Sequence, residues 1–187
     1  MTTTALIEGI AAEITSATQN LLLPVEYQNQ KTKKLEKTLR KVNVYQQYIP
    51  RDMFENDSYY PCVIVEWLNI TDETNGADAN STANVGISCG VYSYESDGWK
   101  DCFRLTDLIR TRLLTRRLIA DKFRLKGDVL WETGENQPLP FFFTYATLPY
   151  EIYQPQEPFV LDRKFPPDLV TAEPKILKPT AFQRRVK

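Results

Sequence analysis

Histidine is absent from this 187-residue chain, and its absence limits the chemistry available. Ser-His-Asp and Cys-His catalytic sets need an imidazole as general base, and H-E-x-x-H zinc sites need two imidazole ligands. Neither G-x-x-x-x-G-K-[ST] nor G-x-G-x-x-G occurs, so a phosphate-cradling loop is not expected either. We therefore predict a chain that is not an enzyme and that has no catalytic residues, cofactor or metal.

Paired carboxylates are the remaining groups whose spacing could do chemistry. Asp97 and Asp101 are four residues apart and could offer oxygen ligands to a divalent cation. Glu132 and Glu135 could form a general acid and base pair. We favour the plainer interpretation, in which Asp97 and Asp101 cap a helix and complement its dipole while Glu135 lies in a polar loop.

Three cysteines, Cys62, Cys89 and Cys102, form no C-x-x-C pair, and each lies within an apolar pattern. A thiol in that setting behaves as a small hydrophobic group, so we expect a reducing compartment and no structural disulfide. No apolar run approaches the roughly 18 residues that cross a bilayer, and the N-terminus lacks the order of a secretory signal. Neither membrane insertion nor secretion is expected.

Charge is distributed unevenly although the net charge is only −1. Between Asp52 and Asp101 ten acids face one base, whereas Lys31 to Arg51 holds seven bases and one acid. Segments of opposite charge let copies of a chain attract one another head to tail, which is the arrangement that closes rings. The alternative is that these charges only face solvent.

The basic run from Lys31 to Lys41, followed by Tyr45 and Tyr48, also has the composition of a single-strand nucleic-acid site. In such sites cations contact phosphates and aromatic rings stack on bases. No nucleic-acid module is recognisable around the run, and the sequence pI is about 5.7. Nucleic-acid binding is therefore kept as an alternative.

Apolar spacing predicts the elements that position these groups. One helix is predicted from Leu6 to Leu21, with Thr4 as N-cap, and another with a broad apolar stripe from Trp99 to Leu114. Strands are predicted around residues 42–48, 60–70, 85–91, 123–131 and 141–145. The second strand is expected to be central and covered on both faces, and the third to face the core with its odd-numbered side. The polar stretch from Thr71 to Asn84 predicts a long exposed connection.

These patterns predict an α+β fold, with a mostly antiparallel sheet of about four to five strands packed by two helices. Residues 1–153 are expected to form one domain. Residues 154–187 contain six prolines and no apolar period, which predicts an extended C-terminal arm that lies along another subunit. A disordered tail is the alternative.

Several segments, taken in their order and spacing, resemble bacteriophage tail terminator (tail completion) proteins, including those of prophages and contractile tail-like particles. The resemblance covers roughly residues 42–153. Its segments are Tyr48-Ile49-Pro50-Arg51, Tyr60-Pro61-Cys62-Val63-Ile64-Val65, Gly90-Val91-Tyr92-Ser93, Asp97-Gly98-Trp99-Lys100-Asp101 with Leu105, Ile109 and Leu113, then Phe123-Arg124-Leu125, Trp131-Glu132 and Pro138 to Phe143.

Proteins similar to this family are α+β subunits that form a hexameric ring on the head-proximal end of the tail tube. The resemblance implies a virion neck protein, assembled in the bacterial host cytoplasm, that ends tube growth and joins the head connector. In contractile tails the ring also meets the sheath. DNA would pass through the lumen without specific recognition. Another neck protein, such as a head completion or tail adaptor subunit, is the alternative.

This interpretation places contacts between subunits and with tube, sheath or connector on charged and apolar residues outside the predicted core. The candidates come from the basic run, the polar connection, the second helix and the arm. They are Lys33, Lys34, Arg40, Asp72, Glu73, Asp78, Arg112, Arg116, Phe159, Phe165, Arg184 and Arg185.

Overall fold

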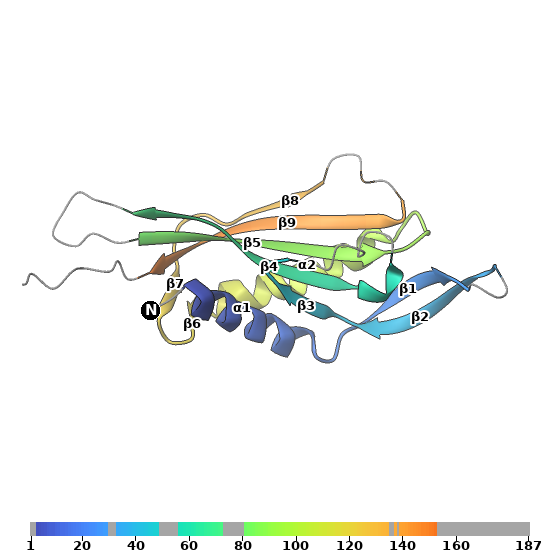
Figure 1. Cartoon of the computed structure of the whole chain (residues 1–187), viewed down its shortest axis with the longest axis horizontal. Helices are drawn as coiled ribbons and strands as arrows, with labels where there is room; N and C mark the ends of the chain where they lie inside the picture. Colours follow the sequence, from blue (N-terminus) through green and yellow to red (C-terminus); the bar gives the residue numbers. More distant parts are fainter. Residues whose placement is uncertain are drawn as a thin grey trace, which may run out of the picture. The chain divides into compact units, whose positions relative to one another are not determined.

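The computed structural model describes residues 3–29, 33–48, 56–72, 81–134, 137 and 139–152. The predicted arm, residues 154–187, lies outside these ranges. The described elements, in chain order, are α1 (Thr3–Thr18), β1 (Leu22–Gln28), β2 (Leu35–Lys41), β3 (Asn43–Gln46), the 3-10 turn η2 (Asp57–Tyr59), β4 (Cys62–Asp72), β5 (Ser81–Tyr92), α2 (Trp99–Thr115), β6 (Leu118–Ile119), β7 (Phe123–Leu125), β8 (Leu130–Thr133) and β9 (Phe141–Ile152) (Figure 1). No described helix is long and apolar enough to cross a bilayer.

Seven of the described strands form one sheet in the order β3-β4-β5-β9-β7-β6, and β8 pairs with β9 on the edge that β7 also uses. Every pairing is antiparallel except that of β3 with β4. Strands β1 and β2 form a separate two-stranded hairpin. The α+β class is therefore confirmed, but the predicted strand count is wrong because short strands and the hairpin were missed.

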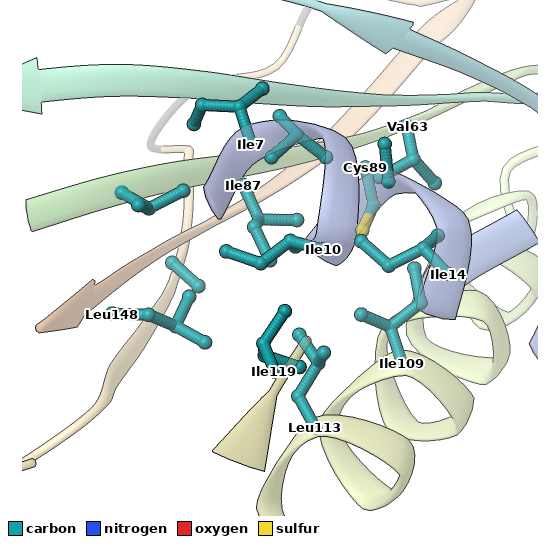
Figure 2. Close-up of a cluster of buried hydrophobic side chains, with 14 of the residues drawn as sticks. Ile7, Ile10, Ile14, Val63, Ile87, Cys89, Ile109, Leu113, Ile119 and Leu148 are labelled. Carbon is teal, nitrogen blue, oxygen red and sulfur yellow. The ribbon is translucent and has the colours of Figure 1, made fainter. Parts of the chain in front are cut away.

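Both helices lie on one face of the sheet, where they close the main core (Figure 1). Figure 2 shows Ile10 and Ile14 of α1 beside Ile109 and Leu113 of α2, and all four side chains are fully buried. Completely burying a side chain of this size contributes roughly 1.5–3 kcal/mol. The apolar stripes predicted on the two helices are therefore the surfaces that pack on the sheet.

The helix ends differ from the sequence prediction. Helix α1 begins at Thr3, so Thr4 lies inside it rather than at the cap, and the helix ends at Thr18, before Leu21. Gly98 occupies the N-cap of α2 without a side-chain hydrogen bond, so Asp97 does not cap it. Asp101 does lie in the first turn of α2, where a negative charge complements the dipole.

The predicted apolar stripe of α2 is too broad at its start. Trp99 and Phe103 are 45% and 40% exposed, whereas Cys102 and Leu105 are buried. A helix turns by about 100° per residue, so the two aromatic side chains lie at the margin of the face that packs on the sheet. They contact each other edge to face, with ring centroids 5.3 Å apart.

Strand β4 is covered on both faces only at its start. Residues Cys62–Val65 are buried, but Trp67 and Leu68 are 46% and 44% exposed next to a register shift. The strand then continues through Thr71 to Asp72, and β5 begins at Ser81. The predicted connection from Thr71 to Asn84 was therefore too long at both ends, because backbone pairing extends the ladder through polar residues.

Strand β5 faces the helices with its odd-numbered residues, as predicted. Val85, Ile87, Cys89 and Val91 are all buried in the main core. On the opposite face a Cβ atom at Gly90 would lie 2.6 Å from Cε1 of Phe143 and 2.9 Å from Sγ of Cys62. Only glycine fits under these neighbours.

We therefore expect Gly90→Ala to lower the free energy of unfolding by about 1–3 kcal/mol, because the neighbouring ring must move to admit a methyl group. Gly134→Ala is the control, because there the nearest atom, Nε2 of Gln137, is 3.0 Å away rather than 2.6 Å. Urea unfolding of both variants measures the difference. Equal midpoints for the two would contradict this account of β5.

Candidate interaction surfaces

The three thiols belong to the core rather than to a reactive site. Cys62, Cys89 and Cys102 are buried and none forms a disulfide, which agrees with their predicted packing role. Burial raises the pKa of the Cys102 thiol to about 11 and that of Cys89 to about 12. Cys62 is shifted in the same direction, again mainly by burial, so all three pKa values favour the protonated thiol.

The paired carboxylates adopt structural roles. Asp97 accepts a hydrogen bond from Lys100 over 3.2 Å, and burial raises the pKa of the Asp101 carboxyl. Within the described ranges no group of three or more His, Cys, Asp or Glu side chains is arranged to hold a metal ion. Glu132 lies in β8, and Glu135 falls outside the described residues.

The described part of the basic run, residues 33–41, includes the second strand of the β1–β2 hairpin. Lys33 and Lys34 lie at its turn, where Lys33 has φ of 58° and its backbone N–H donates to the carbonyl oxygen of Asn29 over 2.8 Å. Strand β2 then pairs with β1 from Leu35 to Lys41. No strand was predicted here from the sequence.

Two bases of this strand are paired with acids of the same chain. Lys37 contacts Glu95 at 2.7 Å and Glu26 at 3.7 Å. Arg40 donates to a carboxylate oxygen of Asp57 over 2.9 Å and to its carbonyl oxygen over 2.7 Å. Part of the attraction between the basic and acidic segments is therefore satisfied within one chain, and head-to-tail attraction between copies stays a prediction.

The predicted interface arginines of α2 also have an intrachain partner. Nη2 of Arg112 lies 2.8 Å from Glu13 Oε2, and Nη1 of Arg116 lies 2.9 Å from Glu13 Oε1. The Glu13 side chain is only 15% exposed. One carboxylate therefore links α1 to the C-terminal end of α2.

The other predicted contact residues are distributed as follows. Asp72, at the end of β4, accepts a hydrogen bond from the hydroxyl of Ser81 at the start of β5. Those outside the described residues are Glu73, Asp78, Phe159, Phe165, Arg184 and Arg185.

An aromatic cluster lies on the face of the sheet opposite the helices. It is built from Tyr60, Tyr92, Phe141 and Phe143, with ring centroids 5.2–6.4 Å apart. These rings come from three of the segments that carry the resemblance: the start of β4, the end of β5 and the start of β9. The segments are far apart in sequence but pack against one another here. Their shared aromatic residues are therefore explained by packing.

The hairpin is attached to this cluster. Val25 of β1 is fully buried among the aromatic rings. The next residue, Glu26, is 7% exposed, and its Oε2 accepts a hydrogen bond of 2.7 Å from the backbone N–H of Tyr94. The aromatic cluster and one buried carboxylate thus fix the hairpin relative to the sheet.

One side of the hairpin presents an apolar stripe. The cross-strand pairs Leu22 with Lys41, Pro24 with Leu39, and Glu26 with Lys37 share one side of the ladder with Leu35, because alternate residues of a strand point the same way. The three leucines are 47%, 63% and 57% exposed in the order Leu22, Leu39, Leu35. We call this side the leucine face.

A second surface is a groove between α2 and β8, on the helix side of the sheet. It comprises three adjoining cavities of about 560, 210 and 220 Å³. Phe103 and Thr144 line two of them, as do Asp107 and Trp131. The indole Nε1 of Trp131 is buried and has no acceptor among the described residues. We call this surface the α2–β8 groove.

Sequence reasoning missed both surfaces. The alternation that marks a strand was present in the sequence, because Leu35, Lys37, Leu39 and Lys41 occupy every second position. The density of lysine and arginine drew attention to charge instead. The groove could not be read from the sequence, because it is formed by a helix and a strand that approach only in the fold.

A comparison of the chain with protein-family models and with curated proteins finds no match.

Because the three thiols are buried, we predict that they react slowly in the folded chain. At pH 8 we expect the folded chain to react with a disulfide reagent such as DTNB at least tenfold more slowly than the urea-unfolded chain, since all three pKa values are raised by burial. Absorbance of the released thiolate measures both rates. Rapid labelling of even one thiol in the native chain would show that the core opens at that site.

The Glu13 bridge predicts measurable coupling between α1 and α2. A double-mutant cycle of Glu13→Ala and Arg112→Ala should give a coupling free energy of about 0.5–1.5 kcal/mol, with a smaller value for Arg116, whose side chain is 54% exposed. Urea unfolding of the single and double variants provides the four free energies. Strict additivity would mean that the contacts between Glu13 and these arginines do not stabilise the fold.

Proposed function

We propose that this chain is a structural subunit that assembles with copies of itself into a ring, and that this ring caps the head-proximal end of a bacteriophage tail tube. The observation that carries the proposal is the leucine face. Three large side chains, each about half exposed, lie on one side of a hairpin whose Val25 is buried in the aromatic cluster. Exposed apolar rows of this kind are typical of protein contact surfaces.

The two surfaces described above support assembly into a ring. A closed ring of identical subunits needs two different surfaces that complement each other, because each subunit contacts its neighbours head to tail. The leucine face and the α2–β8 groove are different surfaces of one domain. Each contains apolar side chains bordered by charges.

The sequence resemblance is the reason for proposing that this ring belongs to a bacteriophage tail. Three of its segments supply the rings of the aromatic cluster, in which Val25 of the hairpin is buried, and another forms the start of α2. Under this proposal the ring is a hexamer that ends tube polymerisation in the bacterial cytoplasm and offers a surface to the head connector. It meets the sheath where the tail is contractile, and DNA passes through its lumen. Lys33 and Lys34 at the hairpin turn are candidate contacts, as are Phe159, Phe165, Arg184 and Arg185.

The alternatives have less support. Nucleic-acid binding by the basic run would compete with the ion pairs that hold Lys37 and Arg40 to acids of the same chain. Another neck role, such as head completion or tail adaptor, would use the same ring geometry at a different level. The position of the ring in the particle separates these neck roles.

The test is to locate the chain in assembled particles and then to remove it. Cryo-electron microscopy should show a ring of this chain between the tail tube and the head connector. Particles assembled without it should contain tubes that exceed the normal length and lack heads, because growth is not stopped. Tubes of normal length that join heads in its absence would refute the proposal.

A further inference from the structure

We draw no further inference here: the strongest candidate, the α2–β8 groove with its largest cavity of about 560 Å³, is lined by Arg110 and Arg117 as well as by Asp107 and Asp128, and nothing in the part of the chain that the structure describes shows what covers it.

Discussion

The close approach of Phe143 and Cys62 over Gly90 is the contact on which the rest of this structure depends. It brings the starts of β4 and β9 against the end of β5, so that the aromatic rings gather on the helix-free face. Val25 can then be buried among them, and Glu26 can accept its hydrogen bond from the backbone beyond β5. A side chain larger than hydrogen at position 90 would disturb each of these steps.

The sequence predicts those parts of the fold in which apolar residues recur at a regular spacing and all of them face the same core. The stripes of α1 and α2 and the odd-numbered side of β5 are of this kind. Strands β6 to β8 are too short to show a period. Strand β2 alternates correctly, but its apolar side faces outward, so hydrophobicity did not distinguish it from a solvated basic segment.

The contact surfaces were harder to predict, because a sequence shows which residues are charged but not which of them pair in the fold. Arg112 and Arg116 look like free surface cations, yet Glu13 lies 99 residues before Arg112 and binds both. Lys37 and Arg40 are matched in the same way. Exposed leucines are more informative than exposed cations here, because they remain 47–63% exposed in the fold and water is a poor partner for them.

The dependence of the hairpin on β9 has a consequence for the order of events during translation. Strands β1 and β2 leave the ribosome early, but two rings of the aromatic cluster belong to Phe141 and Phe143, near the end of the described chain. The hairpin therefore lacks part of its anchor until most of the polypeptide has been synthesised. The leucine face therefore cannot take its final position until β9 has left the ribosome.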